Sequence, residues 1–171
     1  MGREMKRGIV FTLVTMVLFG GMYHGLIWGI GQAVFRRQAE GSLIHRADGT
    51  VAGSSLLAQA FAKPQYFHPR PSAVDFNAAS TGGSNDGPGN PDHLKVVRER
   101  LDALTAAEGV PASSVPSEMV TASGGGLDPH IPPAAAELQL RRVAKERGVA
   151  EDRVRALVSA HTQPPFLGIL G

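Results

Sequence analysis

The sequence predicts an α+β fold: one N-terminal transmembrane helix, then a single domain of three helices and a few short strands. Three observations lead to this prediction. Residues 8–35 are uncharged. Three later segments space their apolar residues three or four positions apart, as on one helix face. Short β-prone pieces flank a turn pair, Asp48 and Gly49. The expected divisions are residues 1–7 before the membrane, 8–35 as the transmembrane helix with its membrane-proximal end, and 36–171 as the domain.

The segment Gly8–Ile30 is long enough to span a bilayer. Its roughly 23 residues extend about 35 Å as a helix, which covers the hydrocarbon core of a membrane. A core helix of a water-soluble protein needs a polar face, and here His24 is the one titratable group besides Tyr23. A cleaved signal peptide is the alternative. Its apolar region is shorter and ends at a small-residue cleavage site, so we favour an uncleaved anchor.

Charges on either side of the span bear on its orientation. Three basic residues precede it, whereas only Arg36 and Arg37 follow it closely, so the positive-inside rule points to a cytoplasmic N-terminus. Residues 36–171 then form an extracytoplasmic domain. The span contains no carboxylate or arginine, so it is not itself expected to be an ion pathway.

Small residues recur every four positions along the second half of the span, at Gly21, Gly25, Gly29 and Ala33. Residues four apart share one helix face. Small side chains on that face allow another membrane helix to approach closely and pack. The sequence therefore predicts a helix-packing site. The alternative is a lipid anchor that tolerates glycine and has no partner.

Composition limits the chemistry of the domain. The chain has no cysteine, which excludes disulfides, thiolate metal sites and thiol nucleophiles. Without Arg3, Lys6, Arg7 and Glu4, the chain keeps 14 basic and 14 acidic residues. A formally neutral domain lacks the basic surface that binds phosphates, so no nucleic acid is expected as a partner.

The first part of the domain is predicted to hold short elements. Residues 43–46 and 50–52 form a hairpin around the turn pair, and residues 56–61 form a short helix capped by Ser54 and Ser55. Residues 64–91 are rich in Pro, Gly, Asn and Ser, as in a linker. They also contain Tyr66, Phe67 and Phe76, so we expect an ordered, irregular segment packed on the domain.

Three helices are predicted in the rest of the domain. The first has Asp92 as its cap, apolar residues at 94, 97, 101 and 104, and an end at Gly109. The second starts after Pro132 and Pro133 and runs to Gly148, and the third continues to His161. The charges of the last two helices balance, which favours a solvated face over a DNA-binding helix-turn-helix. The residues concerned are Glu137, Arg141, Arg142, Lys145, Glu146, Arg147, Glu151 and Asp152.

Two glycine-rich loops could bind an anion. In Thr81–Asn85 the paired glycines permit positive φ, so successive N–H groups could converge on a phosphate. The loop has no lysine and no phosphate-loop ending, and a tight turn capped by Ser84 and Asn85 is the alternative we favour. Ser123–Gly126 permits the same two interpretations.

Hydrolytic and metal chemistry have weak support. Ser84, His68 and Asp86 could form a triad on paper, but no nucleophile elbow or Ser-x-x-Lys motif is present. The histidines lie far apart in sequence. Asp128-Pro129-His130 has no second ligand at helical spacing, so no metal site is predicted.

Several segments taken together resemble the C subunit of the bacterial Kdp potassium-transporting ATPase. The resemblance covers nearly the whole chain, and the order of its pieces makes it specific. The pieces are Gln38–Ile44, Tyr66-Phe67, Arg70–Ser72, Asn77–Ser80, Gly82–Pro88, Thr121–Ile131, Gln139, Arg142–Ala144 and His161-Thr162.

The resemblance implies a non-catalytic accessory subunit of a pump in the bacterial inner membrane. Its partners would be a P-type ATPase subunit, a potassium channel-like subunit, a small single-span subunit and membrane lipid. It would serve assembly and act as a catalytic chaperone that raises the ATP affinity of the ATPase subunit. No cofactor is assigned to this chain by itself, and any contact with ATP would be made together with the ATPase subunit. The nucleotide-linked positions would be Ser80, Gly82, Gly83, Ser84, Asn85 and Gln139.

This sequence departs from the family pattern at two places. His24 stands after Tyr23 where the family usually has a proline, so a kink is not expected there. The family also continues past Leu167–Gly171 into a strand-like tail, so we expect either a missing edge strand or a truncated sequence. An outward-facing domain would not meet cytosolic ATP and would act by docking or at ion entry, with any effect on ATP transmitted through helix packing. The alternative function is a membrane-anchored periplasmic binding or envelope module.

Overall fold

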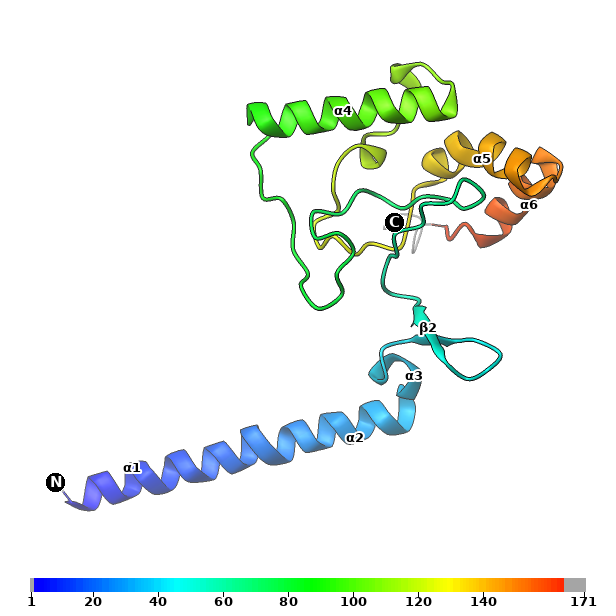
Figure 1. Cartoon of the computed structure of the whole chain (residues 1–171). Helices are drawn as coiled ribbons and strands as arrows, with labels where there is room; N and C mark the ends of the chain where they lie inside the picture. Colours follow the sequence, from blue (N-terminus) through cyan, green and yellow to red (C-terminus); the bar gives the residue numbers. More distant parts are fainter. Residues whose placement is uncertain (1, 165–171) are drawn as a thin grey trace. The chain divides into compact units, whose positions relative to one another are not determined.

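The computed structural model describes residues 2–164 as two compact units, the first ending at Ser55 and the second beginning at Leu56 (Figure 1). The predicted α+β class is confirmed. The first unit contains a long apolar helix and a two-stranded sheet. The second contains three α-helices and short 3₁₀ turns. The sequence piece Leu167–Gly171 lies outside the described residues.

One continuous helix, Gly2–Val34, opens the first unit and is long and apolar enough to cross a membrane. It comprises α1 (Gly2–Thr15), a π-helical segment η1 (Met16–Tyr23) and α2 (His24–Val34). None of its residues is buried. The helix has no proline to kink it, and the wider π-helical turns end where His24 begins α2.

A short helix and a hairpin complete the first unit. After α3 (Arg36–Ala39), strand β1 (Leu43–His45) pairs antiparallel with β2 (Val51–Ser54). Leu43 lies opposite Ser54 and His45 opposite Val51, with an irregularity in the register between Ile44 and His45. Asp48 accepts hydrogen bonds from the N–H and the hydroxyl of Thr50 at 2.9 and 2.6 Å. The predicted hairpin is thus confirmed.

The predicted helix over residues 56–61 is wrong, because that segment contains turns and no helix. Ser54 and Ser55 do not cap a helix. Their hydroxyls donate to the carbonyls of Gly41 and Ser42 at 2.6 and 3.3 Å. The Ala58 N–H donates to the distant Leu127 carbonyl at 2.9 Å instead of to a helical partner. Tertiary hydrogen bonds outweigh local helix propensity here.

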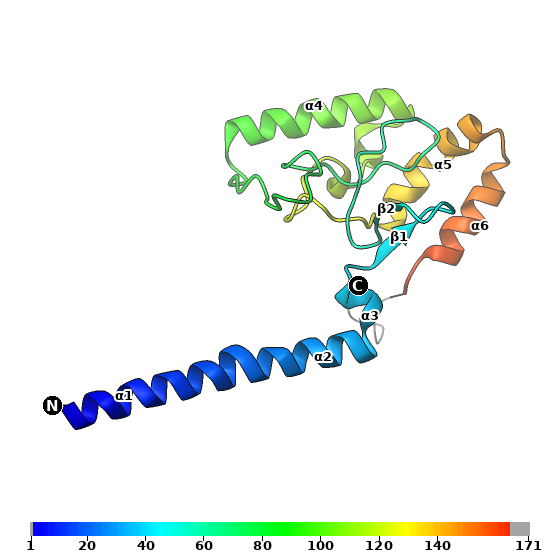
Figure 2. The same cartoon turned by 60° about the horizontal axis from the view of Figure 1, so that its bottom comes forward.

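The three predicted helices of the second unit are confirmed (Figures 1 and 2). They are α4 (Pro91–Glu108), α5 (Pro133–Arg147) and α6 (Glu151–His161), and the short 3₁₀ turns η2 (Ala112–Ser114) and η3 (Ser117–Met119) precede α5. Gly109 and Gly148 end α4 and α5 with φ of 67° and 63°, a conformation that glycine adopts without strain.

The predicted cap of α4 is wrong by two residues. Asn90, not Asp92, is the N-cap, and its side-chain oxygen accepts a hydrogen bond from the Asp92 N–H at 3.0 Å. Pro91 occupies the first helical position, where its fixed φ suits the helix and its missing N–H costs nothing. Asp92 therefore lies within the first turn of α4.

The core of the second unit lies between α5 and α6. Leu140, Val143 and Ala144 of α5 pack with Val154 of α6. Phe67, from the irregular segment before α4, packs against this cluster. The prediction that aromatic side chains hold this segment on the domain is thereby confirmed for Phe67. At the surface, Arg155 donates to Glu137 at 2.8 Å, which links the two helices and raises the pKa of Arg155.

Candidate functional site

The two glycine-rich loops predicted separately from the sequence lie against each other. The Gly82 N–H and the Thr81 hydroxyl both donate to the Gly125 carbonyl, at 3.1 and 2.9 Å. Thr81 and Gly125 are 44 positions apart in sequence. The Ser123 N–H donates to the Pro71 carbonyl at 3.0 Å. One backbone and one side-chain hydrogen bond therefore join the two loops into one layer, and a further backbone hydrogen bond ties this layer to residue 71.

Close backbone approach explains two of these glycines. A Cβ on Gly83 would lie 2.8 Å from the Gly124 carbonyl oxygen. A Cβ on Gly126 would lie 2.6 Å from Val74 Cγ2 and 2.9 Å from the Gly82 oxygen, and Gly126 also has φ of +70°. Gly82 and Gly83, in contrast, are not at positive φ. The positive φ that paired glycines permit is therefore not used at Gly82 or Gly83, and Gly83 and Gly126 instead leave room for the neighbouring loop.

The remaining nucleotide-linked candidates lie near this loop layer and form local hydrogen bonds. The Ser80 N–H donates to the Asn77 carbonyl at 3.0 Å. Ser84 Oγ accepts a long hydrogen bond of 3.5 Å from the Asp86 N–H. Asn85, at φ of 55°, donates its side-chain amide to the Gly83 carbonyl at 3.2 Å. Ser84 and Asn85 are exposed and make these local hydrogen bonds, but the structure has no turn at residues 81–87, so the tight turn that we favoured is wrong.

Gln139 is placed in a separate, fully buried position on α5. Its Oε1 accepts hydrogen bonds from the His68 N–H and from Arg142 Nη2, both at 2.7 Å. Its Nε2 donates to the carbonyls of His68 and Ala135 at 3.1 and 3.2 Å. The amide thus pairs with both backbone groups of His68. Within residues 2–164, no hydrogen bond joins Gln139 to the loop 80–85.

Arg142 extends this network and corrects a prediction. We expected it on a solvated face, but only 13% of its side chain is exposed, and its Nε lies 2.8 Å from Glu108 Oε1 at the end of α4. The Glu108 side chain is 2% exposed. Arg142 Nη1 donates to the carbonyls of Pro64 and Tyr66. One guanidinium therefore ties α4, α5 and the irregular segment together.

Arg147 adds a second cation to the same irregular segment. Its Nε donates to the Gln65 carbonyl at 2.8 Å, and its guanidinium carbon lies 5.4 Å from the centre of the Tyr66 ring. Together with Gln139 and Arg142, it fixes residues 64–68 on α5. We call this set of side chains, Gln139, Arg142 and Arg147 with Glu108, the α5 network.

The structure does not assemble the Ser84, His68 and Asp86 triad that was considered from the sequence. His68 Nε2 lies 3.3 Å from the Lys63 carbonyl, so this nitrogen donates to the backbone. Asp86 accepts from Asn90 Nδ2 at 3.1 Å and lies 3.7 Å from His93 Nδ1. Across the described residues, no group of three His, Asp or Glu side chains could hold a metal ion. The geometry therefore supports neither hydrolytic nor metal chemistry at these residues.

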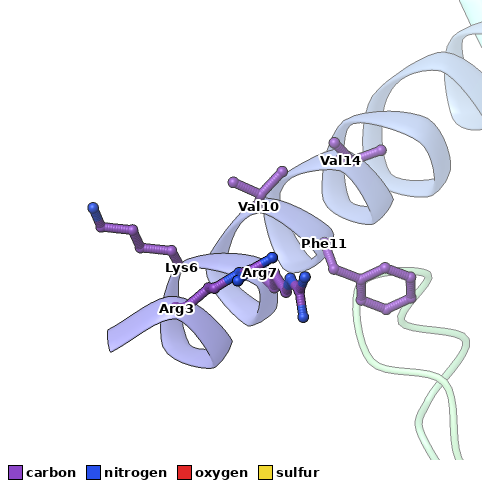
Figure 3. A pocket seen from close by; sticks show the side chains of 6 residues that line it. All are labelled: Arg3, Lys6, Arg7, Val10, Phe11 and Val14. Carbon is purple, nitrogen blue, oxygen red and sulfur yellow. The ribbon is translucent and has the colours of Figure 1, made fainter. Parts of the chain in front are cut away.

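The predicted packing face of the membrane helix is open. An added Cβ at Gly21, Gly25 or Gly29 would meet nothing within 4 Å. Ala33 lies on the same side, one turn further along α2. A hollow on α1 is lined by six residues of that helix alone (Figure 3): Arg3, Lys6, Arg7, Val10, Phe11 and Val14. Side chains along one side of a single helix do not enclose a ligand, so the hollow defines no site.

The fold defines a class of protein: an α+β chain with one apolar helix long enough to span a membrane. A family model described as "KdpC: K+-transporting ATPase, c chain" matches residues 5–171. The chain belongs to this family.

Curated relatives support the same assignment. A potassium-transporting ATPase KdpC subunit from Geobacter sulfurreducens is 47% identical over 99% of this chain and 90% of its own length. One from Sorangium cellulosum is 49% identical over 98% of this chain and 90% of its length. Another, from Caldanaerobacter subterraneus, is 46% identical over the whole chain and 89% of its length.

Proposed function

We propose that this chain is an accessory, non-catalytic subunit of a high-affinity, ATP-driven potassium uptake pump. The observation that carries the proposal is the family match, which covers the membrane helix and the domain together over residues 5–171. The relatives bear the name of a potassium-transporting ATPase subunit. This favours the pump over an envelope module unrelated to transport.

The proposal places the chain in the bacterial inner membrane as a single-pass protein. Residues 1–7 lie in the cytoplasm, residues 8–35 form the transmembrane helix and its membrane-proximal end, and residues 36–171 lie outside. Its partners are the P-type ATPase subunit, the channel-like subunit and the small single-span subunit. Contact with their helices uses the face formed by Gly21, Gly25, Gly29 and Ala33. The open space around these glycines supports close helix approach.

The proposed role in ATP use is indirect. The subunit assists assembly and, as a catalytic chaperone, raises the ATP affinity of the ATPase subunit. Gln139 has its amide engaged by His68, Ala135 and Arg142, and the Gly82 N–H is engaged by Gly125. The nucleotide-linked positions therefore act by holding the domain in shape, and the change in ATP affinity passes through helix packing.

Co-purification tests this proposal. The tagged chain, expressed with the complete pump and extracted in detergent, should retain its partner subunits and support potassium-stimulated ATP hydrolysis. Gly25→Leu should abolish co-purification, because a large side chain prevents close helix approach. Gly8→Leu is the matched control, since its Cβ also meets nothing within 4 Å but it lies off the packing face. A wild-type chain that purifies alone would overturn the proposal.

Orientation has a separate test. Because the chain has no cysteine, single cysteines can be introduced at Lys6 and at the exposed Ser114. The cells keep an intact inner membrane, and any outer membrane is made permeable to the reagent. A maleimide that cannot cross the inner membrane should then label Ser114→Cys and not Lys6→Cys. The opposite labelling pattern would reverse the proposed orientation.

A further inference from the structure

His24 directs one ring nitrogen inward along its own helix. Nδ1 lies 2.5 Å from the Phe19 carbonyl oxygen, five residues earlier. A carbonyl oxygen only accepts, so Nδ1 carries the hydrogen. The backbone N–H of His24 donates a hydrogen bond to the Gly21 carbonyl. In the neutral ring, Nε2 then keeps a lone pair, and among the described residues it has no hydrogen-bond donor as partner.

This lone pair lies deep in the proposed span. The predicted span Gly8–Ile30 has its midpoint at residue 19, so the His24 backbone lies about 8 Å from the middle of the span along the helix. Lipid headgroups begin about 15 Å from the bilayer midplane. Neither headgroups nor bulk water therefore reach Nε2. An unsatisfied polar atom in hydrocarbon is unfavourable, and so is a charged imidazolium.

The surface of α2 around His24 divides into two halves. At about 100° per residue, one half carries the small and polar-tipped side chains, and the other carries large aliphatic ones. The first half holds His24, Gly25, Trp28, Gly29, Gln32 and Ala33. The second half holds Leu26, Ile27, Ile30 and Val34, with Gly31 at the border beside His24.

The first half continues the polar pattern beyond His24. Trp28 and Gln32 follow His24 at four-residue steps, so the three side chains form one row beside the glycine face. Within the part of the chain that the structure describes, no hydrogen bond is found for the Trp28 indole N–H or the Gln32 amide. Aliphatic side chains suit lipid, whereas a row of unsatisfied polar groups suits another helix.

We infer that His24 Nε2 is a hydrogen-bond acceptor for a neighbouring membrane helix of the pump. The partner helix presents a hydroxyl, amide or indole donor to it, beside the glycine face. The Phe19 hydrogen bond holds the ring in the tautomer that offers Nε2 outward. This inference rests on the proposed function, because the donor belongs to a helix of the complex. It adds a polar, directional contact to the steric fit of the glycines.

Three substitutions at His24 separate its two nitrogens. His24→Gln can still present a side-chain oxygen near the Nε2 position, whereas His24→Asn reaches only the Nδ1 position and His24→Phe has no polar atom. The full chain with its pump would be purified in detergent, and the fraction of bound partner subunits measured at increasing detergent concentration. We expect His24→Phe and His24→Asn to retain about three- to tenfold less partner than wild type, the range of hydrogen bonds between membrane helices. His24→Gln should remain near wild type.

Two control variants complete the experiment. Ile27→Phe places the same ring on the aliphatic half, opposite the glycine face, and should leave association unchanged. Thr15→Val removes a hydroxyl whose hydrogen bonds are made within its own helix, to the carbonyls of Phe11 and Thr12, and should also have no effect. His24→Phe inserts into lipid at least as well as wild type, so its loss of partner would not reflect failed membrane insertion.

Several results would overturn the inference. Undiminished association of His24→Phe would show that no hydrogen bond forms at this position. If His24→Asn retained its partner subunits as wild type does, the contact would be assigned to Nδ1. If His24→Gln lost as much partner as His24→Phe, the contact would be assigned to the shape of the ring. In each case a loss by Gly25→Leu would leave the proposed function standing. A wild-type chain that binds no partner would overturn both.

Discussion

The membrane helix and helix α5 use their side chains in opposite ways. Helix Gly2–Val34 buries none of its residues, whereas α5 buries six, including Gln139 at 0% exposure. The polar groups of α5 are engaged within the domain by Glu108, His68 and the carbonyls of residues 64–66. The contrast indicates that α5 stabilises the fold, and it is consistent with our proposal that the membrane helix contacts the partner subunits.

Glycine shows the same contrast. Around Gly25 a Cβ would meet nothing within 4 Å, whereas at Gly126 it would meet three atoms within 3.1 Å. At Gly25, where we propose a partner helix, a side chain has open space; at Gly126, neighbouring atoms of the fold already occupy the space that a side chain would need. Substitution should therefore affect association at Gly25 and stability at Gly126.

The largest effect on stability is expected at Arg142. Arg142→Met leaves the Glu108 carboxylate buried without its cation, and we expect a loss of about 3–5 kcal/mol in unfolding free energy. Urea unfolding of the full chain in detergent, followed by circular dichroism, measures it. The neighbouring, exposed Arg141→Met is the matched control and should change stability by less than about 0.5 kcal/mol. Equal effects of the two variants would contradict the buried ion pair.

A smaller loss is expected at Gln139. Gln139→Leu removes both partners of the His68 backbone, and unsatisfied buried groups cost about 1–3 kcal/mol each. We expect a destabilisation of roughly 2–4 kcal/mol in the same urea measurement. Hydrogen exchange at the His68 amide should also accelerate. Gln163→Leu, at an exposed position, should leave both readouts at their wild-type values. A stable Gln139→Leu variant with slow exchange would show that the amide does not hold this segment.

Gly126→Ala should destabilise the domain by about 1–3 kcal/mol, because the methyl group overpacks against Val74 and the Gly82 oxygen at a positive φ. Gly124→Ala is the matched control two positions away, where a Cβ has open space and φ is not positive. Thermal unfolding of the two variants gives the comparison. A Gly126→Ala midpoint equal to that of Gly124→Ala would mean that the loops do not pack as described.

The smallest effect is expected at the exposed hairpin turn. The Thr50 hydroxyl and then its N–H donate to Asp48, which lowers the pKa of that carboxyl below its ordinary 3.8. The ionised Asp48 therefore stabilises the turn above pH 3.8, and this contribution disappears as the pH falls through the lowered folded pKa. An NMR titration of the Asp48 carboxyl carbon should give a midpoint below 3.8 in wild type and a higher one in Thr50→Val. Identical midpoints would argue against the turn hydrogen bonds.

Local patterns in the sequence predicted much of the fold. The glycines that end α4 and α5, the apolar spacing of the three helices and the Asp48-Gly49 turn all act within a few residues, so they can be recognised from the sequence. The false helix at residues 56–61 failed because Ala58 bonds to Leu127, far along the chain. Propensity carries no information about such a partner.

The sites were harder to predict because their contacts are distant in sequence. Arg142 and Glu108 are 34 positions apart, and Gln139 and His68 are 71 apart. The balanced charges on α5 indicated a solvated face, so the buried ion pair between Arg142 and Glu108 was not predicted. The glycine-rich loops were recognised individually, but their contact with each other was not. The spacing of Gly21, Gly25, Gly29 and Ala33 needed no tertiary contact, and it stays a predicted packing face.

A cysteine scan of the membrane helix tests the central claim most directly. Single cysteines would replace residues 21–33 one at a time, carry a nitroxide label, and be measured in the complete pump with cysteines removed from the other subunits. We predict the lowest label mobility and lipid accessibility at positions 21, 25, 29 and 33, and the highest at 27 and 30. Uniform accessibility around the helix, or protection centred on positions 27 and 30, would contradict the account.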